Sequence, residues 1–272
     1  MSEALARAKL NLALVVGPRR PDGKHDVATV LQALELADRI ALDPAPALAV
    51  RGFADDTLVR TALERVAAAA RVEPDWSVEI EKQIPVAAGL GGGSSDAATA
   101  LRLANDSLRE PLPTERLVEI AAGIGADVPF FLGPSAAIGT GDGSTLEPLE
   151  LPRDYCVLLV LPHGAAKEST AAVYGDFDER RGEYGFDARR SVLEAALARV
   201  RNAHDLSALP PNDLARSETA ANLRELGAFR ADVTGAGPAV YGLFAERADA
   251  VRALETVSAL GRTWLTTPAW YV

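Results

Sequence analysis

Hydrophobic and polar residues alternate along several segments and predict the strands of this chain. Residues 8–14, Ala-Lys-Leu-Asn-Leu-Ala-Leu, alternate so that Lys9, Asn11 and Ala13 share one face. Further strands are predicted over 27–36, 48–53, 76–82, 135–140, 145–149, 156–161, 231–234, 239–244 and 263–266. The segment 156–161 is apolar throughout, which is typical of a strand buried on both faces.

Apolar residues at helical spacing predict the helices. In residues 58–72, Leu58, Ala62, Val66 and Ala69 would lie on one face. Helices are also predicted over 97–108, 114–122, 167–174, 191–202, 214–226 and 248–260, with a charged loop over 176–184. This order of strands, hairpins and helices indicates an α+β fold. The short stretch 151–154 predicts a division into domains 1–150 and 151–272.

A glycine-rich stretch joins the predicted strand 76–82 to the predicted helix 97–108. Residues 85–98 read Pro-Val-Ala-Ala-Gly-Leu-Gly-Gly-Gly-Ser-Ser-Asp-Ala-Ala, with residues 94–96 as helix-start residues. Glycines let a backbone curl and point successive N–H groups at one anion, and a helix N-terminus adds unpaired donors. The stretch therefore predicts a phosphate-binding loop, with a flexible linker or a close-packing turn as the alternative. It has neither a Walker A ending nor a Rossmann fingerprint.

Composition and charge exclude several classes of function. The 272 residues are 48% hydrophobic and 24% charged, and the net charge of −10 offers no basic field to nucleic acid or an anionic membrane. Cys156 is the only cysteine, and His25, His163 and His204 are widely spaced, which argues against disulfides and a zinc site. The start lacks a signal-peptide pattern, and no apolar run approaches the roughly 20 residues of a membrane span. We expect a cytoplasmic monomer or homodimer.

Three stretches resemble the GHMP small-molecule kinases: residues 8–12, residues 85–98, and Thr-Gly-Ala-Gly-Pro at 234–238. Asp-Gly-Lys-His at 22–25, Gly-Ala-Asp-Val-Pro-Phe-Phe at 125–131 and Asn-Asp-Leu at 212–214 narrow the likeness to one branch. That branch phosphorylates the 2-hydroxyl of 4-(cytidine 5'-diphospho)-2-C-methyl-D-erythritol, a small cytidyl-diphosphate substrate of non-mevalonate isoprenoid synthesis. The motifs span nearly the whole chain in the expected order.

The resemblance implies a fold, two cofactors and a set of site residues. The fold would have an N-terminal ribosomal-protein-S5-domain-2-like half and a C-terminal ferredoxin-like half, with an ATP cleft between them; ATP and Mg²⁺ would be the cofactors. Asp127 would act as base on a substrate hydroxyl, and Lys9 would hold that hydroxyl or the transferring phosphoryl group. The implied ATP-binding residues are Pro85, Ala87, Ala88, Gly89, Leu90, Gly91, Gly92, Gly93, Ser94 and Ser95. The implied substrate-binding residues are Asn11, Lys24, His25, Asp127 and Gly235.

Elementary chemistry agrees with these roles, and each residue also has a structural alternative. Phosphoryl transfer is mostly positioning and charge neutralisation, so an anion cradle, one base and one cation suffice. Asp127 would otherwise be a helix N-cap ahead of Pro129, Lys9 a solvated strand residue and His25 an exposed turn residue. The sequence assigns no metal ligands; the Ser95 hydroxyl is one candidate, and helix capping is its alternative role.

Two positions depart from the family pattern. Lys24 stands where the family usually has an aromatic residue that stacks on the base, and Thr57 stands where an Asn is typical. An amine can bind a phosphate or a carbonyl but cannot stack as a ring does. Tyr174, Phe177 and Tyr184 are candidate replacements. The alternatives are therefore a kinase for another alcohol, of the homoserine or sugar class, and a nucleotide-binding sensor without turnover.

Overall fold

The computed structural model describes residues 2–165 and 169–270, and it divides them into two compact units. Unit 1 holds residues 2–8, 36–86 and 91–134. Unit 2 holds residues 9–35 and 87–90 together with the described residues from 135 onward. These units differ from the predicted division at residue 150, because the chain passes between them several times. Two long strands, β1 (Ser2–Arg19) and β2 (His25–Pro44), contribute to both units and extend beyond the predicted 8–14 and 27–36.

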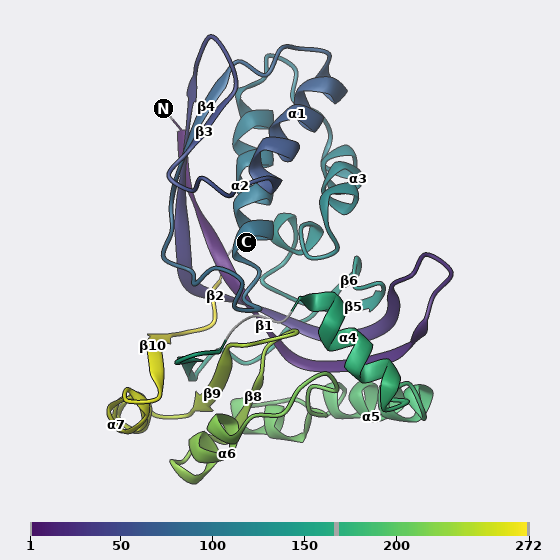
Figure 1. Ribbon diagram of the computed structural model, residues 1–272, viewed down its shortest axis with the longest axis vertical. Coiled ribbons are helices and arrows are strands. Elements are labelled where there is room, and N and C mark those ends of the chain that lie inside the picture. The colour runs from purple at the N-terminus through teal and green to yellow at the C-terminus, as the bar shows by residue number, and fades with distance from the viewer. Residues whose placement is uncertain (1, 166–168, 271–272) are drawn as a thin grey trace. The chain divides into compact units, whose positions relative to one another are not determined.

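Unit 1 combines a small sheet with three helices (Figure 1). Residues 39–44 of β2 pair antiparallel with β4 (Trp76–Glu81), and β3 (Ala49–Arg51) pairs parallel with β4. The helices are α1 (Leu58–Ala70), α2 (Gly92–Ser107) and α3 (Thr114–Ile124), and a 3₁₀ turn, η1 (Pro129–Leu132), follows them. The strand at 76–82 and the helices beginning at 58 and 114 confirm the sequence-based predictions; η1 was not predicted.

Helix α2 begins five residues before the predicted start at Ala97, which corrects that prediction. Its first residue is Gly92, and its N-cap is Gly91, which has a left-handed φ of +71° and makes no side-chain cap bond. Ser94, Ser95 and Asp96 therefore lie inside the helix rather than in front of it. Gly92 and Gly93 have low intrinsic helix propensity, but packing of the first turn decides the outcome, because propensity is a weak prior.

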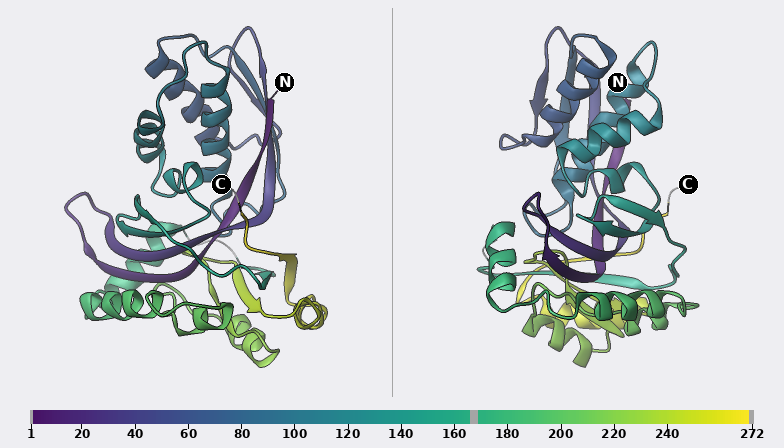
Figure 2. Two further views of the ribbon diagram at one scale, coloured as in Figure 1. Left: turned by 180° about the vertical axis from the view of Figure 1, so that it is seen from behind. Right: turned by 90° about the vertical axis from the view of Figure 1, so that its right-hand side faces the viewer.

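Unit 2 contains two groups of strands. In the first, β1 pairs with β2 around the turn at residues 20–24, as Figure 2 shows. Residues 27–32 of β2 pair antiparallel with β5 (Ala136–Gly141), which pairs with β6 (Thr145–Pro148). The predicted hairpin around residues 141–143 is thereby confirmed.

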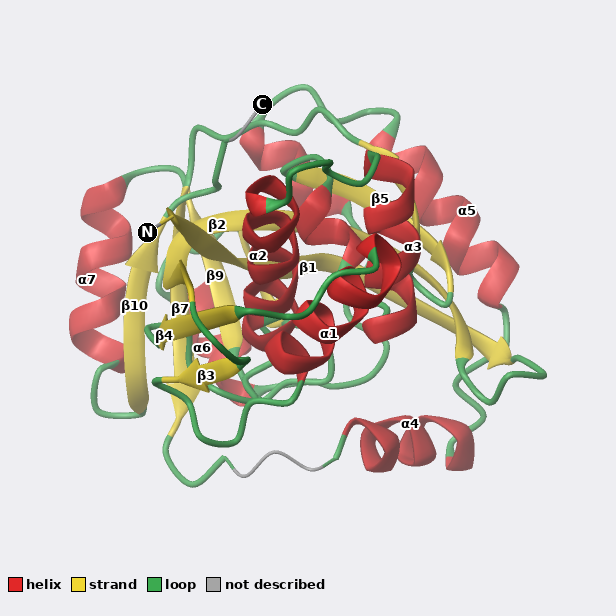
Figure 3. Cartoon of the chain, turned by 90° about the horizontal axis from the view of Figure 1, so that it is seen from above, coloured by secondary structure: helices red, strands yellow, loops and turns green. Residues whose placement is uncertain are grey.

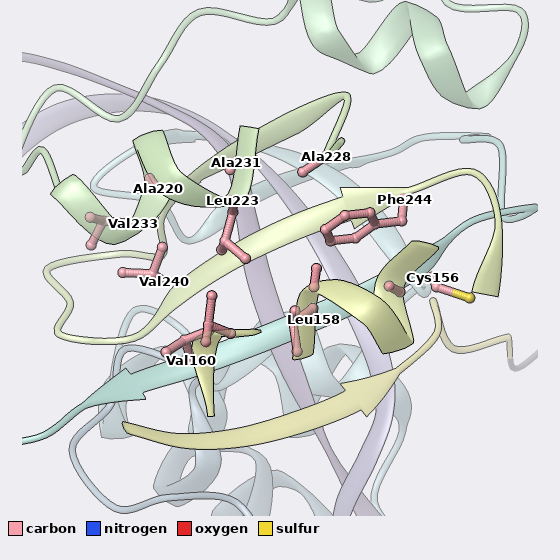
Figure 4. Close-up of a cluster of buried hydrophobic side chains, with 13 residues drawn as sticks. Cys156, Leu158, Val160, Ala220, Leu223, Ala228, Ala231, Val233, Val240 and Phe244 are labelled. Carbon is pink, nitrogen blue, oxygen red and sulfur yellow. The ribbon is translucent and has the colours of Figure 1, made fainter. Parts of the chain in front are cut away.

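The second group is an antiparallel sheet in the order β10-β7-β9-β8. Its strands are β7 (Cys156–Pro162), β8 (Arg230–Val233), β9 (Val240–Phe244) and β10 (Gly261–Thr266). Helices α6 (Glu218–Glu225) and α7 (Arg247–Val257) cover one face of this sheet, and Figure 3 shows α7 beside β10. Alternate β7 residues, Cys156, Leu158 and Val160, join Leu223 and Phe244 in the buried cluster of Figure 4. Successive side chains of a strand point to opposite faces of the sheet, so these three β7 residues share one face and contribute to this core.

Three helices of unit 2 differ most from their predicted bounds, and α7 ends at Val257 rather than at 260. α4 (Thr170–Glu179) extends into the predicted charged loop 176–184, because Phe177 is buried in a small apolar cluster; the predicted start at Lys167 lies outside the described residues. α5 (Phe186–Leu197) starts five residues before 191, and the 3₁₀ turn η2 (Ala203–Ala208) follows it. α6 starts at Glu218 rather than at 214. None of the helices in the described ranges is long and apolar enough to cross a membrane.

Candidate active site

The glycine loop, residues 85–95, has a curled backbone. The φ angles are left-handed at alternate residues: +60° at Ala87, +84° at Gly89 and +71° at Gly91. Such backbone conformations form concave, N–H-lined sites for anions. A Cβ atom on Gly89 would lie 2.3 Å from the backbone oxygen of Thr234, so no side chain fits at that point. The flexible-linker alternative is therefore wrong, whereas this curled, closely packed backbone agrees both with a phosphate-binding loop and with a close-packing turn.

Lys9 and Asn11 lie on β1 and are both buried. The Lys9 ammonium donates to Asn11 Oδ1 at 2.6 Å, and the Lys9 backbone N–H donates to the oxygen of Leu90 at 2.9 Å. The Asn11 amide donates to Thr29 Oγ1 at 2.8 Å, and the Thr29 hydroxyl donates to the oxygen of Ala13. Lys9 is only 4% exposed. The alternative of a solvated strand residue is therefore wrong for Lys9.

The stretch at 234–237 meets the same group of residues within unit 2. The backbone N–H of Asn11 donates to Thr234 Oγ1 at 3.0 Å, and the Thr234 hydroxyl lies 3.4 Å from the oxygen of Gly89. A Cβ atom on Gly235, where φ is +59°, would lie 3.6 Å from Lys9 Nζ and 3.3 Å from Asn11 Oδ1. The Ala239 N–H also donates to the oxygen of Ala88. Three motifs far apart in the sequence thus meet around Lys9.

Asn212 fixes the position of the 234–237 turn. Its side-chain amide donates to the oxygens of Val233 and Gly235 at 3.0 and 2.7 Å, and its Oδ1 accepts from the N–H of Leu214 at 2.8 Å. Because the backbone at 212–214 is held in this extended network, it is not available to begin a helix. This network is the physical reason that α6 starts later than the apolar pattern predicts.

Asp127 lies in unit 1, in the turn between α3 and η1. The residue at the N-cap of η1 is Val128, and no side chain caps that turn. Asp127 is half-buried. The N-cap alternative is therefore wrong for Asp127.

His25 and Lys24 take part in different contacts of unit 2. His25 Nε2 lies 2.7 Å from Asp178 Oδ1, and its ring lies 4.8 Å from the ring of Tyr174. His25 is 7% exposed, so it is not an exposed turn residue. Lys24 donates to Asp142 at 2.5 Å. Burial opposes ionisation of Asp142, but hydrogen bonds from Lys24 and Ser144 outweigh it and lower the Asp142 pKa to about 2.

The serines of the glycine loop do not cap α2, and the described residues contain no preformed metal centre. Ser95 is buried in the first turns of α2, so the capping alternative is wrong for it. Among the described residues, no three His, Cys, Asp or Glu side chains gather to hold a metal ion. A dedicated metal cage is therefore not part of the described structure.

Several residues of this network carried no signal in the sequence. Thr29 holds the Asn11 amide, yet a lone Thr on an apolar strand looks ordinary, and Asn212, which the motif at 212–214 includes, was given no role in holding Gly235. The sequence also gave no sign that Lys82, which precedes the glycine loop, contacts two buried aspartates. Such partners are far apart along the chain, so only an alignment or a structure brings them together.

Comparison with known proteins places these motifs in a family. Residues 57–133 match the model of the GHMP kinases N terminal domain, and residues 217–263 match that of the GHMP kinases C terminal domain. The chain is 38% identical to the 4-diphosphocytidyl-2-C-methyl-D-erythritol kinase of Kineococcus radiotolerans, over 87% of this chain and 79% of that protein. It is 40% identical to the protein of the same name in Streptomyces coelicolor, over 85% of this chain and 83% of that one.

A solved structure agrees with the sequence relatives. The crystal structure of a 4-(cytidine 5'-diphospho)-2C-methyl-D-erythritol kinase superposes with a TM-score of 0.79 at 31% identity. The superposition covers 98% of this chain and all of that one (100%). The predicted α+β, two-domain kinase fold is thereby confirmed. The chain belongs to the GHMP kinase family.

Proposed function

We propose that this protein transfers a phosphoryl group from ATP to the 2-hydroxyl of 4-(cytidine 5'-diphospho)-2-C-methyl-D-erythritol. As a GHMP kinase it is an ATP-dependent enzyme that acts on a small molecule. The observation that carries the narrower proposal is identity of 33–40% to kinases named for this substrate over most of the chain. The convergence of Lys9, Asn11, Gly89 and Gly235 in unit 2 supports it.

The reaction assigns a role to each candidate residue. The substrate's hydroxyl oxygen forms a bond to the γ-phosphorus of ATP while the bond from that phosphorus to the ADP oxygen breaks. Asp127 takes the hydroxyl proton, as a carboxylate base can when the proton leaves during bond formation. Lys9 supplies one positive charge to the hydroxyl or the transferring group, and Asn11 holds its ammonium in place.

The glycine loop is the proposed nucleotide site. Its left-handed residues curl the backbone, and the α2 N-terminus directly follows it. Both features favour the β- and γ-phosphates, because N–H groups and the helix dipole present partial positive charge. The proposed contacts are residues 85 and 87–95.

Mg²⁺ is proposed to bind together with ATP. Mg²⁺ in kinases is held chiefly by phosphate oxygens and water, with one or two protein ligands. The absence of an acidic cluster among the described residues fits that mode and does not fit an all-protein site. We assign no step of the reaction to a protein-bound metal, and the Ser95 hydroxyl remains the one proposed contact.

The cytidine end of the substrate is proposed to bind beside His25. Lys24 is engaged with Asp142 and offers no ring. The ring of Tyr174 lies next to the His25 ring, so α4 supplies the aromatic surface that position 24 lacks. Tyr184 is 89% exposed and Phe177 is only 1% exposed, so Tyr174 is the best placed of the three candidates.

A direct assay tests the proposal. The purified protein with ATP, Mg²⁺ and the cytidyl substrate should release ADP at a rate that depends on that substrate. Asp127→Asn keeps the size of the side chain but removes the base, so kcat should fall about 10²–10⁴-fold. Binding of ATP to the variant, measured by calorimetry, should stay within about threefold, since a base acts on the transition state.

Two outcomes would overturn the proposal in different ways. If Asp127→Asn kept kcat, the base would be another group. If the wild type released ADP with homoserine or a sugar and not with the cytidyl substrate, this specificity would indicate a sibling kinase. Lys24, in its ion pair with Asp142, would then mark the changed substrate site. Tight ATP binding with no ADP from any alcohol would indicate the nucleotide sensor.

A further inference from the structure

A buried charge cluster lies on both sides of the glycine loop in the sequence. Asp38 is on β2, Lys82 follows β4, and Asp96 is in the first turns of α2; we call these three residues the Lys82 cluster. The Lys82 ammonium contacts Asp38 Oδ2 and lies 2.6 Å from Asp96 Oδ2. The Asp38 and Asp96 side chains are 0% and 2% exposed, and that of Lys82 is 16% exposed. All three residues belong to unit 1.

The cluster fixes the chain that leads into the loop. Asp38 Oδ1 accepts the backbone N–H groups of Gln83 and Ile84, the second at 2.8 Å, immediately before Pro85. Asp38 Oδ2 simultaneously holds Lys82. Both oxygens of one buried carboxylate are therefore occupied by the three residues that precede the glycine loop. Charge-assisted bonds of this kind are about twice as strong as neutral ones.

The same ammonium fixes the chain that leaves the loop. Asp96 anchors the first turns of α2 to Lys82, and a Cβ atom on Gly92 would lie 3.3 Å from Lys82 Nζ. The Lys82 ammonium therefore links the residues before the glycine loop to those after it. The curl of residues 85–92 depends on the positions of these flanking residues.

Stability alone does not explain three buried charges. Each ion loses several kcal/mol of hydration, and well-packed apolar residues often serve as well or better. Asp96 Oδ1 is buried and has no hydrogen-bond partner among the described residues, so the cluster retains an uncompensated polar atom. A cluster with the same charges lies next to it: Arg39 contacts Glu3 and Glu81, and all three side chains are 37% exposed or more. The hydrogen bonds that the backbone N–H groups of Gln83 and Ile84 donate to a side chain both go to Asp38 of the buried cluster.

We propose that Asp38, Lys82 and Asp96 are positioning residues that hold the glycine loop in the shape that binds ATP. This inference rests on the proposed function only in taking ATP as the loop's ligand. Asp38 is fully buried and acts through the loop. Its loss should therefore weaken ATP binding without weakening binding of the alcohol substrate.

Asp38→Asn and Lys82→Met test this proposal, with Arg39→Gln as the matched control from the exposed cluster. Asp38→Asn keeps the size and one oxygen acceptor but leaves Lys82 with one carboxylate. We expect the KM for ATP to rise about tenfold or more, with the KM for the cytidyl substrate within about twofold. Arg39→Gln should leave both KM values within about twofold. The double variant should be little worse than the poorer single variant, because the residues act as one unit.

Equilibrium binding of ATP, measured by calorimetry, separates this inference from the proposed function. If the wild type binds ATP but phosphorylates no cytidyl substrate, the proposed function fails, and the affinities of the variants still decide the role of the cluster. Should Lys82→Met fail to fold, Lys82→Arg keeps the charge and should retain ATP affinity within about fivefold. Folded Asp38→Asn with wild-type ATP affinity would overturn the proposal. Equal loss of affinity for both substrates would also overturn it, because it would indicate a general structural defect.

Discussion

The two parts of the glycine loop are held by different kinds of interaction. In unit 2, residues 87–90 are held by neutral hydrogen bonds and close contacts: Ala88 with Ala239, Leu90 with Lys9, and Gly89 against Thr234. In unit 1, residues 91–96 follow a chain fixed by the charges of the Lys82 cluster. The strength of neutral hydrogen bonds depends on their geometry and hardly on pH, whereas interactions between buried charges depend on both geometry and pH. The two parts should therefore fail in different ways.

The largest effect is expected from Gly89→Ala. The φ of +84° strains any side chain, and the added Cβ would lie 2.3 Å from the oxygen of Thr234, so the backbone must move. Displacement of a substrate-positioning loop by about 1 Å lowers kcat/KM about 10²-fold. Steady-state kinetics with varied ATP measures this change.

Gly175→Ala is the matched control for that variant. Gly175 lies within α4, and nothing lies within 4 Å of the added Cβ. Activity should stay within about twofold, and the free energy of unfolding should rise by about 0.4–1 kcal/mol because alanine restricts the unfolded chain. Equal losses in the two variants would contradict a specific role for Gly89.

A pH-dependent effect is expected from Asp96→Asn. Burial and the Asp38 carboxylate raise the pKa of Asp96 from 3.8 to about 7, although Lys82 opposes the change. Between about pH 4 and pH 7, Asp96 therefore keeps its proton in the folded state and has released it in the unfolded state. The stability that Asp96 contributes is fully present below about pH 4 and is lost as the pH rises to about 7, by up to about 1.4 kcal/mol per unit.

Urea unfolding of the wild type and Asp96→Asn at several pH values measures this contribution. The free energy of unfolding of the wild type, relative to the variant, should fall between pH 4 and pH 7 and then level. A difference that stays constant across this interval would show that the carboxyl group titrates alike in the folded and unfolded states.

A smaller effect is expected from Thr234→Val in unit 2, where residues 87–90 are held by neutral hydrogen bonds. The change removes the oxygen that accepts the Asn11 N–H and leaves a buried donor unpaired. We expect a loss of about 1–3 kcal/mol in the free energy of unfolding. Because no charge is involved, the loss should be the same at pH 5 and pH 8. A pH-dependent loss would contradict the contrast between the two sides of the loop.

Sequence patterns predicted the parts of the fold that depend on local periodicity. The strand at 76–82, the helix beginning at 58 and the hairpin around 141–143 follow from alternation, helical spacing and turn residues. The start of α2 and the start of α6 did not follow. Gly91 caps the first with left-handed backbone, and the contacts of Asn212 keep the chain before the second extended. The low helix propensity of Gly92 and Gly93 hid the first start, and the second depends on bonds from Asn212 to Val233 and Gly235, which are distant in the sequence.

The candidate site was likewise predicted only in part from the sequence. Lys9, Asn11, Gly89 and Gly235 were predicted from motifs, and the structure brings these four together. The burial of Lys9 was not predicted, because its environment includes residues as distant in the sequence as Gly235. Asp38 and Lys82 lay in ordinary-looking segments, and their pairing depends on the register of β2 against β4.

The position of the new phosphate in the product tests the central claim most directly. Phosphorus NMR of the purified product, with ATP and the cytidyl substrate as the only reactants, reports which oxygen is phosphorylated. We predict a single phosphomonoester at the 2-hydroxyl, with the cytidine diphosphate left intact. Phosphate on another hydroxyl, or ATP consumption with the substrate unchanged, would contradict the account.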